Sequence, residues 1–305
     1  MSGQLLLRWV YYDKNIVLNQ NVPAKAAYRY TTSMSENNLF QQAEQCLFCA
    51  DPAAKCALTD ELLQALGEGR VSFDVVGTPR PISEPGRPAR PRLVAPRDLA
   101  RRRPGSVEGR ASLLHAIAHI EFNAINLAWD AVYRFRDMPA SYYTDWARVA
   151  GEESLHFRLL CGRMQDMGYS YGDFDAHNGL WESACDTAHD PLVRMALVPR
   201  VLEARGLDVT PAIMQRLEKS GDHASVGVLE TILRDEIGHV EIGTRWYRSL
   251  CAQRGLDAQR TFIELLERYM KGRVRGPFHL EARRQAGFNK QELADLERLA
   301  SRGKQ

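Results

Sequence analysis

Two Glu-x-x-His motifs, each inside a long stretch of helical periodicity, constrain this chain more than any other feature. One further glutamate precedes each motif, 32 residues before the first and 33 residues before the second. The chain therefore repeats the order Glu, then Glu-x-x-His, on two helix pairs. This order matches the ligand set of a carboxylate-bridged dinuclear metal site inside a four-helix bundle. The six residues are Glu121, Glu153, His156, Glu203, Glu236 and His239.

The six residues lie on the apolar faces of four expected helices, over residues 107–135, 140–167, 190–206 and 222–254. Residues three apart share one side of a helix, so the glutamate and the histidine of each motif can hold one metal ion together. One such motif alone is typical of a solvated helix face. Burying an unpaired carboxylate costs several kcal/mol, however, so four of them in one core require cations. Four carboxylates and two imidazoles favour iron or manganese.

Three residues beside these ligands are candidates for hydrogen bonds that would orient them. Glu152 and Asp235 each precede a ligand glutamate, so either could accept the free ring N–H of a ligand histidine. The alternative is an exposed charge at the helix edge, which is the favoured interpretation for Glu152. His119 forms an i, i+4 pair with His115, but it lies about 200° around the helix from Glu121. We therefore expect His119 to form hydrogen bonds near the site or between helices, and not to bind the metal.

The distribution of proline divides the chain. Seven of the 14 prolines fall within residues 79–104, together with eight arginines. Proline at this density excludes helix interiors and predicts an extended segment. Its arginines could contact phosphate or RNA, although a strap that pairs with acidic helix faces is the favoured interpretation. The expected organisation is an N-terminal arm and small helical region over 1–78, a linker over 79–105, a four-helix bundle over 106–254 and a C-terminal helical extension over 255–305.

Shorter helices are expected beside the bundle. Residues 36–69 predict two helices with a break at Asp51-Pro52 between them. Thr59 is the expected N-cap of the second helix. Pro211 is expected to open a separate short helix after the third bundle helix. Residues 1–35 alternate aromatic and apolar side chains, as a hairpin or an arm on the main body would.

The overall composition excludes several classes of protein. The net charge is +2 and the pI is near 8.2, so neither a nucleic-acid tail nor an acidic solvating segment is indicated. No run approaches the roughly 18 to 20 apolar residues that span a bilayer, and the N-terminal apolar region is too short for a secretory signal. We therefore expect a cytoplasmic protein with no membrane partner.

A polar stretch from about residue 169 to residue 190 separates the second and third expected helices. Bundles of the ferritin type need one long crossover of this kind, whereas up-down bundles use short loops. The sequence resembles the ferritin-like superfamily, and within it a bacterial family of unknown function. The resemblance covers roughly residues 105–250 and the later GPFHLEARRQAGF, and it rests on LLHAIAHIEFNAINLAWDAVYRF, EESLHF, YGDFDAHNGLW, VPRVLEARGLDVTP and ILRDEIGHVEIGTRW.

The resemblance implies an all-α fold: a ferritin-like four-helix bundle with a long crossover between its second and third helices, and extra helices at both ends. It also implies a non-haem di-iron centre held by the six residues named above. Two iron ions are the expected cofactor, with a mixed manganese–iron pair as the other choice.

The leading functional hypothesis is an oxidoreductase in which the di-iron site activates dioxygen to hydroxylate or desaturate an organic substrate. Other ferritin-like bundles hydroxylate a modified tRNA base, so the substrate is expected to be a small molecule or a tRNA, with a separate electron donor. The alternative is a ferroxidase or iron-handling protein without an organic substrate. The segments before and after the bundle would interfere with packing into a storage shell, so a monomer or a small homo-oligomer is expected.

Overall fold

The structure is a computed structural model that describes residues 37–302, except 76, 101, 104 and 271–273. Within these residues the fold is all-α, and the only β pairing is two isolated bridges, Asn38 with Ser72 and Leu93 with Ala176. None of the helices in this part of the chain is long and apolar enough to cross a membrane. The arm expected over residues 1–35 lies outside the described residues.

The described helices follow one another in three groups. Before the proline-rich linker lie α2 (Leu39–Phe48) and α3 (Pro52–Gly67). The central group consists of α4 (Val107–Arg134), α5 (Ala140–Asp166), α6 (Gly179–Asp186), α7 (Pro191–Leu197), the π-helical turn η2 (Val198–Glu203), α8 (Ala204–Lys219) and α9 (His223–Gln253). The last group consists of α10 (Ala258–Met270), α11 (Leu280–Gln285) and α12 (Lys290–Arg302).

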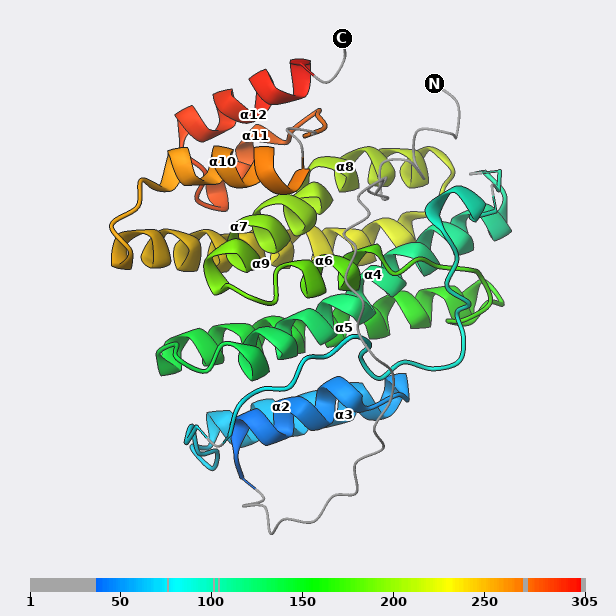
Figure 1. Cartoon of the computed structure of the whole chain (residues 1–305). Helices are drawn as coiled ribbons and strands as arrows, with labels where there is room; N and C mark the ends of the chain where they lie inside the picture. The colour runs from blue at the N-terminus through cyan, green and yellow to red at the C-terminus, as the bar shows by residue number, and fades with distance from the viewer. Residues whose placement is uncertain (1–36, 76, 101, 104, 271–273, 303–305) are drawn as a thin grey trace.

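The central helices pack lengthwise against one another (Figure 1). α4 packs along α5, and α9 packs against α5 on one side and against the continuous segment α7–η2–α8 on the other. Three predicted helix starts are confirmed, because Ser106, Asp190 and Asp222 each accept a hydrogen bond from a backbone N–H of the following first turn, at 3.0, 2.8 and 3.2 Å. These caps fix where the helices that carry the predicted ligands begin.

The outer helices lie on opposite sides of this central group (Figure 1). α2 and α3 pack against α4 and α5, whereas α10 and α11 pack against α7, α8 and α9. The buried Lys55 fastens α3 to the central group, because its Nζ donates to the Asn126 side chain at 2.5 Å and to two carbonyls at the end of α2. Thr59 was expected to cap α3, but Asp51 does so, and Thr59 lies inside the helix and accepts the indole N–H of Trp129 at 3.0 Å.

The third long segment differs from the prediction. A break near Gly206 and a separate helix from Pro211 were expected, but α8 runs unbroken through both positions. Its buried face against α9, which includes Leu207 and Ile213, stabilises the helix in spite of the missing proline N–H. The irregularity lies earlier, in the π-helical turn η2, where Pro199 cannot donate a backbone hydrogen bond.

The linker is extended, with one short 3-10 turn at Pro96–Asp98, as its prolines predict. Three of its arginines form ion pairs with acidic side chains on neighbouring elements: Arg80 with Glu44 at 2.9 Å, Arg92 with Asp175 at 2.7 Å and Arg102 with Glu108 at 2.9 Å. These contacts agree with a strap along the helices. Contact of the linker with RNA stays a prediction.

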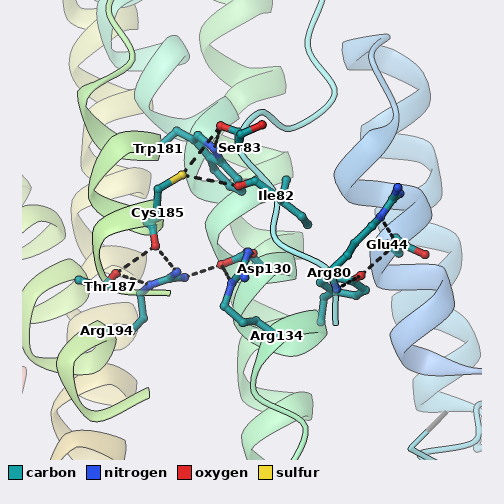
Figure 2. A network of polar contacts seen from close by, with 12 residues as sticks. Glu44, Arg80, Ile82, Ser83, Asp130, Arg134, Trp181, Cys185, Thr187 and Arg194 are labelled. Atoms are coloured by element: carbon teal, nitrogen blue, oxygen red, sulfur yellow. Dashed lines mark hydrogen bonds and ion pairs between the residues drawn. The ribbon is translucent and has the colours of Figure 1, made fainter. Parts of the chain in front are cut away.

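A buried ion-pair network ties the crossover to α4 (Figure 2). The Arg194 guanidinium donates to Asp130 at 2.8 Å, to the Thr187 hydroxyl at 2.7 Å and to the carbonyl of Ala184 at 2.6 Å. Arg134 donates to the same Asp130 carboxylate at 2.6 Å. Because charge buried without partners is costly, this network fixes the position of α7 relative to α4.

The crossover contains a helix, α6, where a loop was expected. The buried Trp181 holds it in place, since its indole N–H donates to the carbonyl of Ser83 in the linker at 2.9 Å (Figure 2). α6 is short and buries only two side chains, Trp181 and Ala184. Such a segment is too short for the periodicity of its apolar residues to identify a helix.

Candidate metal centre

Three helices bring four of the six predicted ligands together. Glu121 on α4, Glu153 and His156 on α5, and Glu236 on α9 each place one ligand atom within 4.8 Å of the others. All four side chains are buried. Glu153 and His156 share one face of α5 because they lie three residues apart.

Glu153 lies at the middle of the group and joins it to a fifth predicted ligand, His239. One of its carboxylate oxygens is 3.4 Å from Nδ1 of His156, and the other is 3.1 Å from Nδ1 of His239. Glu121 lies 3.3 Å from His156 Nδ1, and Glu236 lies 3.8 Å from His239 Nδ1. The arrangement therefore has two halves that share Glu153.

Glu203, the sixth predicted ligand, is the last residue of the π-helical turn and lies outside the 4.8 Å group. Burial raises the pKa of Glu203 well above its usual value, and the negative charges of Glu236 and Glu153 raise it further. The charges of Glu236 and Glu153 therefore act on Glu203, and its role as a ligand stays a prediction.

The donor atoms of these residues fit a metal centre. Buried carboxylate and imidazole atoms normally have hydrogen-bond partners. Among the predicted ligands, Glu203 Oε2 and Glu236 Oε2 have no hydrogen-bond partner among the described residues, and Glu153 Oε1 and His239 Nδ1 lie 3.1 Å apart in an ion contact without hydrogen-bond geometry. Oxygen-rich sites with imidazole nitrogens suit iron and manganese.

The pKa shifts within the group arise from burial and from the charges of neighbouring ligands. Burial raises the pKa of Glu121 and of Glu236, and the charge of Glu153 raises both further. Burial would also raise the pKa of Glu153, but its contacts with Glu121, His156 and His239 lower it. Burial would lower the pKa of His156, yet its contacts with Glu121 and Glu153 raise it to about 11. Protons therefore neutralise this buried negative charge, and a cation would do so in their place.

Two carboxylates outside the group hold the histidines from the opposite helix. Glu152 on α5 lies 2.7 Å from Nε2 of His239 on α9, and Asp235 on α9 lies 3.1 Å from Nε2 of His156 on α5. A carboxylate accepts, so each Nε2 carries the proton and each Nδ1 is left to face the ligand group. The sequence favoured an exposed charge for Glu152. The structure corrects this, because the register of α5 against α9 brings its carboxylate to the His239 ring.

His119 does not contact the ligand group. Its Nδ1 lies 2.8 Å from the Tyr171 hydroxyl in the crossover, and its Nε2 lies 3.1 Å from the Asn123 side chain. Of the two roles expected for His119, the structure shows a hydrogen bond that links α4 to the crossover and none to the ligands, because His119 projects from a different face of α4 than Glu121. His115 lies in the same cluster, with its ring stacked on Tyr171 at 5.3 Å.

Comparisons with known proteins relate this chain to proteins of unknown function. A protein of Haemophilus influenzae, named only as an uncharacterized protein, is 47% identical over 264 residues, which cover 83% of this chain and 92% of that protein. No solved structure matches significantly. Residues 48–294, which include all six predicted ligands, match the family described as "Protein of unknown function (DUF455)". The chain therefore belongs to the DUF455 family.

Proposed function

We propose that this protein is a ferritin-like non-haem di-iron oxidoreductase that uses dioxygen to hydroxylate or desaturate an organic substrate. The observation that carries the proposal is the position of Glu153 between two histidines, each held from the opposite helix by a carboxylate. A paired arrangement of this kind matches the ligand pattern of di-iron carboxylate bundles.

The helix order supports a ferritin-like bundle. α4 and α5 form the first pair, and the segment α7–η2–α8 forms the second pair with α9. The connection between the pairs, which contains α6, is the long one that such a bundle requires.

The ligands divide into two halves. Glu121 and His156 would hold one ion, Glu203, Glu236 and His239 would hold the other, and Glu153 would contact both. Iron bound there supplies one-electron and dioxygen chemistry that the protein side chains lack.

The substrate would be a small organic molecule. Three arginines of the linker already pair with acidic side chains of the same chain, which disfavours a phosphate-rich substrate such as tRNA. The reaction would also need an external one-electron donor to return the iron to the ferrous state.

Oxygen exposure of the iron-loaded protein tests this proposal. Protein loaded anaerobically with ferrous iron should oxidise it faster than ferrous iron in buffer, with the rise of ferric absorption in an optical spectrum. Glu236→Ala should abolish the acceleration, whereas Glu230→Ala, at an exposed position of the same helix, should leave it unchanged. Oxidation no faster than in buffer would contradict the proposal. A particle of many subunits in solution would instead favour iron storage.

A further inference from the structure

The π-helical turn η2 is the irregular element nearest to the proposed metal centre. It interrupts the third long segment between α7 and α8, and it ends at Glu203. π-helical turns are rare and occur mostly at functional sites, because the extra residue changes the direction of the side chains around it. The position of the Glu203 carboxylate therefore depends on what holds this turn in its shape.

Arg200, on the same turn, packs against α9 and the C-terminal helices. Its side chain is 0% exposed. Three aromatic rings enclose its guanidinium: the distances from Cζ to the ring centroids are 4.6 Å for Tyr247, 4.1 Å for Phe262 and 4.6 Å for Phe288. Aromatic faces stabilise a cation at such distances, and most strongly when water is excluded.

Glu292 on α12 neutralises this buried charge. One of its oxygens accepts from Arg200 Nη2 at 2.5 Å, and the other accepts from Arg248 on α9 at 2.9 Å. The same carboxylate caps α12, because it also accepts from the backbone N–H of Asn289 at 2.8 Å. The start of α12 is therefore tied to the turn that carries Glu203.

The turn is also fixed by close contact with α9. A side-chain carbon at Gly243 would lie only 2.3 Å from the ring of Pro199, so only glycine permits this approach. Pro199 and Arg200 thus hold neighbouring residues of the turn against α9 and the C-terminal helices.

We propose that Arg200 is a positioning residue for the metal ligand Glu203, and that the C-terminal helices take part in shaping the metal centre through it. This inference rests on the proposed metal centre. Arg200 does not itself coordinate the metal; it fixes the π-helical turn so that the Glu203 carboxylate meets the half of the site that holds Glu236 and His239.

A matched pair of variants tests this role. Arg200→Met removes the buried cation from the turn, with similar side-chain length. Arg283→Met is the control, because Arg283 is also buried, pairs with Asp208 on α8 at 2.7 Å and lies 5.2 Å from the Phe288 ring. Both changes remove a buried arginine that joins the C-terminal helices to the third segment, but only Arg200 belongs to the turn that carries Glu203.

The readout is anaerobic titration with cobalt(II), with the visible spectrum of the bound ion as the signal. The wild-type protein should bind two ions. Arg200→Met should weaken the binding of one of them by about 10- to 100-fold and change its spectrum, as loss of a supporting contact does at other metal sites. Arg283→Met should keep both affinities and the spectrum, although it lowers the unfolding temperature. Arg200→Lys, which keeps the cation, should restore part of the affinity.

Three outcomes separate the inference from the proposed function. A wild-type protein that binds no cobalt would overturn the proposed centre and this inference with it. Wild-type binding of two ions, with unchanged affinity and spectrum in Arg200→Met, would overturn the inference alone, as would equal losses in Arg200→Met and Arg283→Met. If Arg200→Met does not fold, Glu292→Gln provides the same test: it should weaken one ion only, and unchanged binding would overturn the inference.

Discussion

Glu152 on α5 and His239 on α9 meet at 2.7 Å, and this contact fixes which nitrogen of the imidazole faces the proposed metal centre. The Glu152 side chain is 35% exposed, whereas His239 is fully buried. A partly exposed carboxylate therefore holds a buried ring from the solvent side. The contact between Asp235 and His156 repeats this relationship with the two helices exchanged.

Glu152→Ala should weaken metal binding without removing a ligand. The His239 ring would lose the acceptor that orients it, and loss of such a partner costs about 10- to 100-fold in metal affinity. Competition with a coloured chelator measures this change. Glu230→Ala, an exposed glutamate on α9, is the control and should have no effect. Equal affinities for wild type and Glu152→Ala would show that the contact does not orient a ligand.

Removal of metal should destabilise the protein more at pH 8 than at pH 6. Burial raises the pKa of Glu121 and Glu203 above the usual 4.5, and contacts with carboxylates raise that of His156 from 6.5 to about 11. A group with a raised pKa binds its proton more tightly in the folded state, so its contribution to stability is lost as the pH rises.

Bound metal replaces these protons, so the loaded protein should lack this part of the pH dependence. Unfolding temperatures with and without a chelator, measured at both pH values, provide the test. A chelator effect that is equal at the two values, or larger at pH 6, would contradict the account.

Arg194→Met should strongly destabilise the fold. The change leaves the buried Asp130 with Arg134 alone and removes the donors to Thr187 and Ala184. Breaking a buried pair on one side costs about 3–5 kcal/mol. Urea unfolding measures the loss, and Arg260→Met serves as the control.

The control replaces an exposed arginine whose ion pair with Glu264 spans 3.7 Å at the surface. Pairs of this kind contribute little to stability. Equal unfolding midpoints for Arg194→Met and the wild type would show that the network in Figure 2 does not hold α7 to α4.

Local chemistry explains which parts of the fold the sequence could predict. The starts of the helices that follow Ser106, Asp190 and Asp222 were predictable because each cap is a property of one side chain and its own first turn. The prediction of Thr59 as a cap was wrong for a related reason. Its residue type suits a cap, but its hydroxyl accepts a hydrogen bond from the indole of Trp129, which is distant in the sequence.

In the candidate site, too, local features were predictable and features that depend on long-range packing were not. The i, i+3 spacing of Glu153 and His156 is local, so their common face on α5 was predictable. The exchange of partners, with Glu152 on His239 and Asp235 on His156, depends on the register between two helices far apart in sequence. The π-helical turn before Glu203 was missed as well, because packing against α9 and the C-terminal helices determines its shape.

These buried carboxylates and histidines are proposed to hold a dinuclear metal centre. The most direct measurement is elemental analysis of protein purified from its native host, compared with Glu153→Ala, which removes the carboxylate between both histidines. We predict about two iron or manganese ions per wild-type chain, and loss of this stoichiometry in the variant while the helical circular-dichroism spectrum is kept. A wild-type protein without bound metal, or a variant that retains both ions, would contradict the account.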